Sequence, residues 1–400
     1  MQAKNIVVGV SGGIAAYKTA ELVRLFVGKD FYTKVVMTEN ATRFVSPLTF
    51  EALSGNRVIH DMFDRDNSSI EHIVWGQESD MIVVAPATAN VIGKMANGIA
   101  DDFLSTMLAA ATAPILLCPS MNTRMFLNPA VQANIETLKR YGHNVMSPAD
   151  GDLACHAKGT GRLPEPPEIF EQALFILTKK DFSGVKVLVT AGPTVEPIDP
   201  VRFISNRSSG RMGYALARAA RLRGADVILV SGPTSIPSPV GVRTIHVKTA
   251  EDMRAAVMDN RHDSDVIIKA AAVADYRPAV IAEQKIKKGP ESMVIPLEKN
   301  PDILSELGKT KKDFSYLLIG FAAETEDLVK NARKKLASKS LDMIVANDVS
   351  KPGAGFDTNT NIVKIIYSNG SVEDLPIMTK DEVAFNVLDR IRSLFQPPMT

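Results

Sequence analysis

The chain has 400 residues, more than one ordinary hydrophobic core accommodates, so its length alone predicts two or three domains. Hydrophobic residues make up 45% and charged residues 23%, which are the proportions of a soluble globular protein. Its 46 basic and 45 acidic residues leave a net charge of +1. That balance excludes a general attraction to nucleic acid or to a membrane surface, so any anion-binding site must be local.

The N-terminal segment is apolar but short, and Gly and Ser interrupt it, so it is interpreted as a first strand rather than a signal peptide. No apolar run approaches ~18 residues, and no membrane span is expected. The two cysteines, Cys118 and Cys155, are too few for a disulfide framework. We therefore expect a cytoplasmic protein.

Short β-branched segments alternate with amphipathic segments, which predicts an α/β protein of two tandem doubly wound domains. The strands predicted in the first half are Asn5–Val10, Thr33–Met37, Met81–Ala85 and Ile115–Cys118. The helices predicted there are Ile14–Val27, Asp102–Ala110 and Pro129–Arg140.

The pattern changes at Arg162–Glu168, where three prolines in seven residues argue against a regular element. A helix over Ile169–Thr178 and the polar segment Lys179–Gly184 follow, so we expect domains 1–180 and 181–400. The strands predicted after this boundary are Val185–Thr190, Asp226–Val230, Val266–Ala270, Tyr316–Gly320, Asp342–Ala346 and Ile362–Tyr367. The helices are Met212–Arg223, Ala250–Asn260, Glu326–Ser338 and Asp381–Leu394.

A glycine-containing turn, Ser11-Gly12-Gly13, joins the first predicted strand to a helix, and its backbone N–H groups suit an anion. The turn lacks the GxGxxG pattern and the P-loop lysine, so neither NAD nor ATP is indicated. Close packing alone explains such a turn equally well. However, polar residues also follow the next two strands, at 37–40 and 85–90, and 101–106 adds hydroxyl groups. These turns favour a phosphorylated, planar cofactor at the carboxyl edge of the sheet.

Three further residues of the first half are candidates for chemistry. His72 precedes a strand, although a lone histidine is more often a packing or surface residue. Asn122 follows a buried strand, where it either caps the next helix or binds a substrate carboxylate. Cys155 lies in a glycine-rich loop, 150–163, where packing does not explain a cysteine and chemistry does.

Four segments of residues 1–165 together resemble the flavin-containing cysteine decarboxylases, specifically the phosphopantothenoylcysteine decarboxylase family. They are SGGIAAYK (11–18), APATAN (85–90), PSMN (119–122) and LACHAKGTGRL (153–163). The resemblance implies a flavodoxin-like domain that binds FMN. It also implies that His72 is the active-site histidine, Asn122 the asparagine of the PxMN motif, and Cys155 the cysteine of a flap over the substrate. The FMN contacts assigned from these turns are Ser11, Gly12, Gly13, Ile14, Thr38, Asn40, Thr88 and Ser105.

The chain departs from this family at Trp75, in the segment after the histidine, at Ser120 where Ala is typical, and at His156 where Gly is usual. None of these changes removes a reactive group. Decarboxylation of a cysteine requires an electron sink, which a flavin provides by oxidising the CH2–SH group to a thioaldehyde. The step then needs a base, a carboxylate anchor and a proton donor, the roles given to His72, Asn122 and Cys155.

The second half contains two candidate phosphate sites. Residues 206–213 (NRSSGRMG) open a predicted helix and form a Gly/Ser anion cradle. A dinucleotide turn for NAD(P) is the alternative, but the glycine spacing does not fit it and the loop is about fifteen residues too long. Residues 285–289 (KIKKG) usually mark only a solvated face, or else they fold over a triphosphate.

Residues 184–395 resemble the phosphopantothenate–cysteine ligases, which implies a Rossmann-like domain that uses CTP. The matching segments are 190–213, AAVADYR (271–277), KIKK (285–288), NPDIL (300–304), GFAAET (320–325) and ANDVS (346–350). The resemblance links Asn206 to formation of an acyl-cytidylate and Lys285 to its reaction with cysteine, while Arg211 replaces a usual lysine. The CTP contacts it implies are Lys269, Ala270, Ala271, Asp275, Lys285, Pro301, Asp302, Ile303, Leu304, Phe321, Lys335 and Lys339.

The ligase reaction also implies Mg²⁺ (or Mn²⁺), held mainly by the CTP phosphates, with Asp275 as a further candidate ligand. The expected partners are small molecules, namely 4'-phosphopantothenate, cysteine and CTP. The resemblance further implies a homo-oligomer with a trimer-based decarboxylase core and dimeric ligase domains.

Two other functions remain open at this point. A flavin prenyltransferase-like domain fused to an NAD(P)-binding reductase leaves Cys155 and the KIKK segment unexplained, and turnover of NADPH would favour it. A non-catalytic flavin-binding regulator does not need His72, Asn122 and Cys155 together. The visible spectrum of the purified protein discriminates among these functions.

Overall fold

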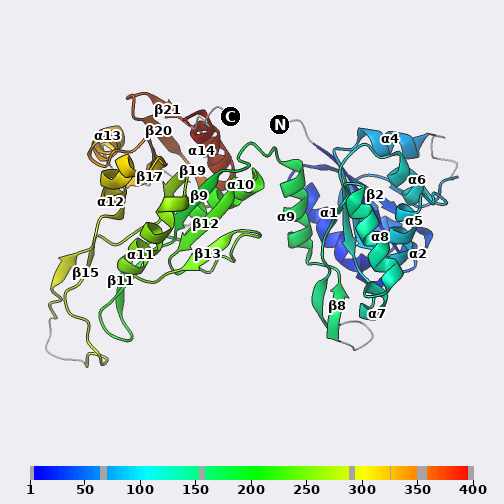
Figure 1. Cartoon of the computed structure of the whole chain (residues 1–400), viewed down its shortest axis with the longest axis horizontal. Helices are drawn as coiled ribbons and strands as arrows, with labels where there is room; N and C mark the ends of the chain where they lie inside the picture. Colours follow the sequence, from blue (N-terminus) through cyan, green and yellow to red (C-terminus); the bar gives the residue numbers. More distant parts are fainter. Residues whose placement is uncertain are drawn as a thin grey trace. The chain divides into compact units, whose positions relative to one another are not determined.

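The computed structural model describes residues 4–63, 70–152, 158–287, 293–324, 326–348 and 358–394. The chain divides into two compact units, 1–178 and 179–400, each built on its own sheet (Figure 1). Within the described ranges, no helix has both the length and the apolar character needed to cross a membrane. The two units are therefore described in turn.

The first unit is built on a six-stranded sheet in the order β3-β2-β1-β4-β5-β6, and every neighbouring pair is parallel. Its strands are β1 (Asn5–Val10), β2 (Tyr32–Met37), β3 (Val58–Ile59), β4 (Met81–Ala87), β5 (Ile115–Pro119) and β6 (Asn144–Val145). The strand order reverses between β1 and β4. In an open α/β sheet, ligands bind at the carboxyl ends of the strands beside such a switch point.

Helices cover both faces of this sheet, because alternate residues of its buried strands point to opposite sides. Val8 of β1 packs into a core with α1 (Thr19–Val27), α3 (Pro47–Ser54) and α9 (Pro166–Leu177). Val7 packs into the opposite core, whose helices are α4 (Glu71–Glu78), α5 (Ala89–Ala96), α6 (Phe103–Ala110) and α8 (Pro129–Arg140). The remaining short elements are the 3-10 helix η1 (Ile14–Lys18), α2 (Glu39–Thr42) and α7 (Thr123–Phe126).

The end of the first unit differs from the prediction in two places. The expected loop 150–163 contains an antiparallel hairpin, β7 (Ala149–Asp152) and β8 (Lys158–Arg162). The proline-rich stretch does not exclude a regular element, because α9 begins inside it with prolines at its first positions. Proline is tolerated there since the first N–H groups of a helix have no partner within the helix.

The second unit is built on an eight-stranded sheet in the order β13-β12-β9-β14-β17-β18-β20-β21. Its strands are β9 (Lys186–Ala191), β12 (Asp226–Ser231), β13 (Arg243–His246), β14 (Val266–Lys269), β17 (Leu317–Glu324), β18 (Met343–Asp348), β20 (Val363–Tyr367) and β21 (Val372–Asp374). The pairs from β13 to β18 are parallel, whereas β20 and β21 add an antiparallel edge. The strand order reverses between β9 and β14, so the second unit has a switch point of the same kind.

One core of the second unit packs α10 (Arg211–Leu222) and α14 (Lys380–Leu394) against the sheet. The opposite core contains α11 (Ala250–Asn260), α12 (Ile303–Thr310) and α13 (Leu328–Ser338). Arg223, just after α10, donates to Asp181 at 2.6 Å and to Asp389 at 2.7 Å. This buried guanidinium therefore ties the start of the second unit to its last helix. The short elements are η2 (Arg261–Asp263), η3 (Lys311–Asp313), β19 (Thr360–Asn361) and β22 (Met378–Thr379).

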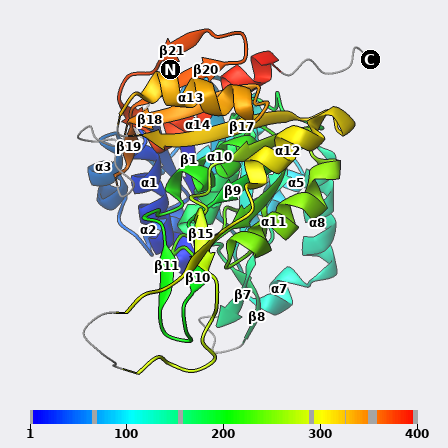
Figure 2. The same cartoon turned by 90° about the vertical axis from the view of Figure 1, so that its left-hand side faces the viewer.

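An arm of short antiparallel strands extends from the second sheet, as Figure 2 shows for β10, β11 and β15. It consists of β10 (Val195–Pro197) paired with β11 (Phe203–Ser205), and β15 (Tyr276–Pro278) paired with β16 (Leu297–Lys299). These strands were not predicted, because three residues are too few to show an alternating pattern and two of the strands end in proline.

Candidate functional sites

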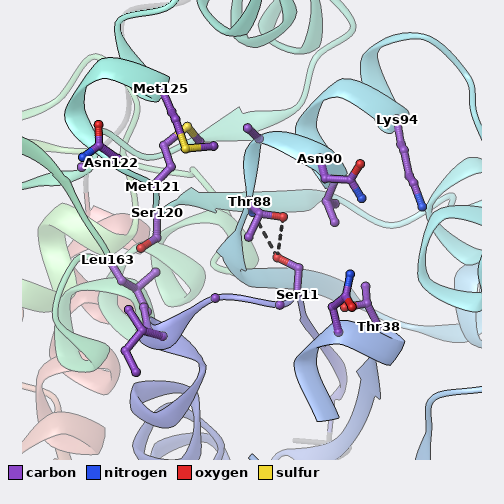
Figure 3. Close-up of a pocket in the computed structure, with 18 of the residues that line it drawn as sticks. Ser11, Thr38, Thr88, Asn90, Lys94, Ser120, Met121, Asn122, Met125 and Leu163 are labelled. Carbon is purple, nitrogen blue, oxygen red and sulfur yellow. Dashed lines mark hydrogen bonds between the residues drawn. The ribbon is translucent and has the colours of Figure 1, made fainter. Parts of the chain in front are cut away.

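A cavity of about 990 Å³ opens at the switch point of the first unit (Figure 3). It is formed at the carboxyl ends of β1, β2, β4 and β5 and by the end of β8. Seven of the eight predicted cofactor contacts line it, namely Ser11, Gly12, Gly13, Ile14, Thr38, Asn40 and Thr88. The eighth, Ser105, does not: it is buried in α6, where its hydroxyl lies 2.8 Å from Asp102 in a capping box.

Ser11 and Thr88 join the ends of β1 and β4 at the base of this cavity. The Ser11 hydroxyl donates to Pro86 O at 2.7 Å and accepts from the Thr88 N–H at 3.0 Å. The two hydroxyl oxygens lie 3.1 Å apart, as Figure 3 shows. A Cβ at Gly12 would lie 2.5 Å from the Asn40 Cβ, so only glycine lets the first turn approach the second this closely. The turns therefore form one continuous wall.

The opposite rim of the cavity carries a charged cluster. Lys94 of α5 contacts Asp101 at 2.6 Å and Asp102 at 2.7 Å. Burial opposes the charged form of Lys94, but its hydrogen bonds to the two carboxylates raise the pKa above its usual range. The cluster thus fixes the segment between α5 and α6 beside the cavity.

Asn122 lines the same cavity and also caps α7, where its Oδ1 accepts from Arg124 N–H at 2.8 Å. The helix cap is therefore confirmed, and the binding of a substrate carboxylate stays a prediction. The neighbouring Met121 N–H donates to Gly161 O of β8 at 2.9 Å. Gly161 has a φ of +152°, and a Cβ there would lie 2.2 Å from Met121 O. A glycine is thus required for the hairpin to dock on the Asn122 loop.

His72 does not line this cavity. His72 is half-buried on α4, and its ring lies edge-on to Phe103 with the ring centroids 6.2 Å apart. Cys155 and His156 lie outside the described residues, between the two strands of the β7–β8 hairpin. Trp75, also on α4, is buried and receives the Lys34 ammonium 4.7 Å from its ring centroid.

A second cavity of about 500 Å³ lies at the switch point of the second unit. The predicted nucleotide contacts that line it are Lys269, Ala270, Ala271, Asp275, Pro301, Asp302, Ile303, Leu304, Phe321, Lys335 and Lys339. Asn206 and the predicted Gly/Ser cradle line it too, with the cradle at the N-terminus of α10. Basic side chains outnumber acidic ones among these lining residues, so the cavity suits an anionic ligand.

Lys269 is the most perturbed group in this cavity. Its residue is 7% exposed, and burial lowers the pKa of its ammonium to about 7, which Asp302 opposes and Lys339 reinforces. Lys339 lies 2.8 Å from Asp302 Oδ2, and Asp302 also caps α12 by accepting from Ser305 N–H at 3.0 Å. An anion that entered the cavity would favour the charged form of Lys269.

The two predicted catalytic residues of the second unit differ in position. Asn206 lies in the cavity wall, where its amide N–H donates to Ala272 O at 3.3 Å and Val273 O at 3.0 Å. Lys285 does not line the cavity; it is exposed on the segment beside the β10–β11 hairpin. Of the two residues that the resemblance assigns to this reaction, only Asn206 lines the cavity formed by the described residues.

The sequence analysis did not single out four polar residues that line this cavity, namely Asn300, Asn347, Asn361 and Lys380. Asn361 is 4% exposed, and its Oδ1 has no hydrogen-bond partner among the described residues. Lys380 is 8% exposed at the start of α14. A lysine that begins an amphipathic helix gives no signal of burial in the sequence.

Comparison with known proteins matches two family models to the chain, one over each unit. Residues 1–175 match the family model described as Flavoprotein, and residues 182–395 match that of the DNA/pantothenate metabolism flavoprotein C-terminal domain. The coenzyme A biosynthesis bifunctional protein CoaBC of Bacillus subtilis is 50% identical over 98% of this chain and 97% of that protein. The chain belongs to the bifunctional coenzyme A biosynthesis family.

Other members of this family match over the same span. CoaBC of Escherichia coli is 42% identical over 97% of this chain and 96% of that protein. A crystal structure of the C-terminal domain of a CoaBC protein is 46% identical and covers 54% of this chain and 98% of that chain, with a TM-score of 0.47. The predicted fold class, two tandem α/β domains with a flavodoxin-like domain first, is confirmed.

The first cavity fits a flavin. Its volume of about 990 Å³ accommodates a three-ring system with a phosphorylated chain. Hydroxyl groups from Ser11, Thr38 and Thr88 surround it, and no side chain caps the backbone N–H groups that follow Gly13. These N–H groups would hold the phosphate, and Asn122 lines the cavity next to Met121, on which the β7–β8 hairpin docks.

Proposed function

We propose that this chain catalyses two consecutive reactions of coenzyme A biosynthesis. The second unit condenses 4'-phosphopantothenate with cysteine through an acyl-cytidylate formed from CTP. The first unit then decarboxylates 4'-phosphopantothenoylcysteine to 4'-phosphopantetheine with FMN. The observation that carries this proposal is the pairing of two different cavities at two switch points, in a chain that matches bifunctional relatives over nearly its whole length. We place the boundary between the activities near residue 180.

In the decarboxylase site, the bound flavin supplies the two-electron oxidation and reduction of the substrate carbon that bears sulfur. The backbone N–H groups that follow Gly13 and the Thr88 hydroxyl would hold the cofactor phosphate, while Ser11, bonded to Pro86 O and to the Thr88 N–H, holds the two turns together. Asn122 anchors the substrate carboxylate with the amide that the α7 cap orients. His72 takes the thiol proton, and Cys155 returns a proton at the end of the reaction.

In the ligase site, the substrate carboxylate attacks the α-phosphorus of CTP and pyrophosphate leaves. Lys269, Lys335 and Lys339 would hold the triphosphate, and Mg²⁺ would be held mainly by the phosphates, with Asp275 as its candidate protein ligand. Asn206 positions the reacting phosphate from the cavity wall. The cysteine amine then attacks the activated carbonyl, CMP leaves, and Lys285 neutralises the departing charge.

Assembly into a homo-oligomer is part of this proposal, since His72 and Lys285 do not line the cavities formed by the described residues of their own units. Large apolar side chains are exposed at the mouth of the first cavity, with Ile14 60% and Tyr17 61% exposed. A neighbouring copy would cover them and bring its own His72 to the substrate. We propose a trimer-based decarboxylase core, dimeric ligase domains and a cytoplasmic location.

One experiment tests both activities. The purified protein is incubated with CTP, Mg²⁺, cysteine and 4'-phosphopantothenate, its visible spectrum is recorded, and the products are identified by mass spectrometry. The wild-type chain should show a flavin band and form 4'-phosphopantetheine. The His72→Asn variant should keep the flavin band and stop at 4'-phosphopantothenoylcysteine. Turnover of NADPH, or ligation with ATP in place of CTP, would contradict the proposal.

A further inference from the structure

Asp199 is a buried carboxylate that no step of the proposed reactions uses. Its residue is 3% exposed and lies at the tip of the β10–β11 hairpin, between the two strands. Its Oδ1 accepts from Val201 N–H at 2.8 Å and from Arg202 N–H at 2.7 Å, which closes the turn. A buried carboxylate destabilises the fold unless hydrogen bonds or charges compensate it, so the second oxygen also needs a partner.

The second oxygen of Asp199 bonds a segment far along the chain. Asp199 Oδ2 accepts from Ile286 N–H at 3.1 Å, and Arg202 Nη2 donates to Ile286 O at 3.1 Å. Both backbone polar groups of Ile286 are therefore held by the hairpin tip. The neighbouring Ala282 N–H donates to Ile198 O at 2.9 Å, which adds a third link between the two segments.

This clamp, formed by Asp199 and Arg202 on Ile286, fixes the residue that follows Lys285. Ile286 is half-buried, whereas Lys285 and Lys287 on either side of it are exposed. The clamp therefore holds the backbone and leaves the Lys285 ammonium directed outward. The backbone hydrogen bonds, beside the Arg202 guanidinium, also keep the pKa of Asp199 below its usual range despite its burial, so it is ionised at neutral pH.

The same hairpin continues into the ligase cavity. β11 ends at Ser205, and Asn206 follows directly in the cavity wall. The Ser205 hydroxyl donates to Thr194 O at 2.7 Å, which closes the base of the hairpin. One short hairpin thus carries Asn206 at its base and holds the Lys285 segment at its tip.

We propose that Asp199 is a positioning residue for Lys285, and that it acts by holding Ile286 N–H. The proposal rests on the proposed ligase function, in which Lys285 serves the second step. A carboxylate is required because both its oxygens accept. In Asp199→Asn, one oxygen is replaced by an NH2 group that cannot accept from Ile286 N–H. The loosened segment should then slow amide formation more than formation of the acyl-cytidylate.

The test follows both steps in single-turnover reactions of the full-length chain, with quenched samples analysed for pyrophosphate, acyl-cytidylate and amide product. In Asp199→Asn, amide formation should fall at least roughly tenfold, pyrophosphate release should stay within about threefold, and the acyl-cytidylate should accumulate. The matched control is Glu283→Gln, which removes an exposed carboxylate from the same segment and should behave as wild type. Equal loss of both steps, or an unchanged amide step, would overturn the proposal.

Hydrogen exchange on the wild-type chain provides a second measurement, which does not depend on the variant folding. The Ile286 amide should exchange at least roughly tenfold more slowly than the amides of the exposed residues Lys285 and Lys287. Exchange at the same rate would overturn the clamp. If the wild-type chain releases no pyrophosphate from CTP, the ligase function fails instead, and the exchange result still decides whether the clamp exists.

Discussion

The Thr88 N–H donates to the hydroxyl oxygen of Ser11 at 3.0 Å, and this contact links the turns that follow β1 and β4. The Ser11 hydroxyl in turn donates a hydrogen bond to Pro86 O at 2.7 Å. Ser11 is 1% exposed, so water cannot replace either of these two hydrogen bonds unless the turns separate. The two strands that flank the switch point are thereby held at the spacing that the cavity requires.

Substitution of Ser11 by Ala should weaken flavin binding. The variant leaves the Thr88 N–H without an acceptor and loosens the two turns that would hold the cofactor, so we expect the dissociation constant for FMN to rise roughly tenfold, or about 1.4 kcal/mol. Titration of the apoprotein with FMN, followed by the quenching of flavin fluorescence, measures the effect. Thr42→Ala is the control, because the Thr42 hydroxyl bonds only Glu39 O within its own helix at 2.7 Å. Unchanged affinity in Ser11→Ala would contradict this role.

Substitution of Gly161 by Ala should impair decarboxylation and leave ligation intact. The new Cβ would meet Met121 O, so the β7–β8 hairpin must move away from the Asn122 loop. We expect CO2 release to fall by at least roughly tenfold, while CTP-dependent amide formation in the other unit is unchanged. Separate assays of the two reactions on one sample measure both.

The matched control for this variant is Gly142→Ala. Gly142 also has a positive φ, of +89°, but a Cβ there meets nothing within 4 Å. Both variants therefore carry backbone strain, and only Gly161→Ala adds the collision. A similar loss of CO2 release in the two variants would show that backbone strain alone, rather than hairpin docking, is responsible.

The regular elements could be predicted where local signals and burial agree. The helices Pro129–Arg140 and Ala250–Asn260 were predicted at the residues where they occur, because Asn128 and Thr249 cap them. The arm of the second unit could not be predicted, because its three-residue strands are stabilised by pairing with distant segments rather than by their own pattern.

The two cavities were predictable to the extent that they follow the ends of parallel strands. The glycine and hydroxyl residues after β1, β2 and β4 meet in space because parallel strands share one carboxyl edge. Asn361 and Lys380 were not predicted because they belong to the part of the chain that adds the antiparallel edge of the sheet. The prediction considered only residues that follow parallel strands. Ser105 was misplaced because its hydroxyl caps a helix instead of facing the cavity.

Binding of CTP should depend on pH through Lys269. Burial lowers the pKa of Lys269 to about 7, so its ammonium is charged below that pH and neutral above it in the free enzyme. The charged form attracts the triphosphate, so the contribution of Lys269 to affinity is largest below pH 7 and declines as the pH rises. CTP gains negative charge over the same range, and the informative quantity is therefore the ratio of variant to wild-type dissociation constants.

For Lys269→Gln, this ratio should be roughly 3- to 10-fold larger at pH 6 than at pH 8.5. Isothermal titration calorimetry at several pH values measures it. Lys334→Gln, which removes an exposed charge from α13 next to the cavity-lining Lys335, should give a ratio that does not change with pH. A ratio for Lys269→Gln that is independent of pH would mean that Lys269 stays in one protonation state.

Asn206 and Lys285 should fail at different steps of ligation. The Asn206 amide donates to Ala272 O and Val273 O, so Asn206→Asp would place a carboxylate against two carbonyl oxygens and beside the phosphates. A loss of ~2–4 kcal/mol of transition-state stabilisation at this position would slow the first step by about 30- to 1,000-fold. Lys285 is exposed and remote from that wall, so Lys285→Gln should still release pyrophosphate but form little amide.

Mass spectrometry of quenched single-turnover reactions separates these outcomes. Lys285→Gln should accumulate the acyl-cytidylate, because the activated carbonyl forms and then waits for the amine. Asn206→Asp should form both the intermediate and the product much more slowly, since the first step itself is slowed. Lys287→Gln is the control for charge, because Lys287 is exposed on the other side of Ile286 and has no assigned role. If Lys285→Gln binds CTP but accumulates no intermediate, Lys285 serves the first step, and the division of roles between the two residues is wrong.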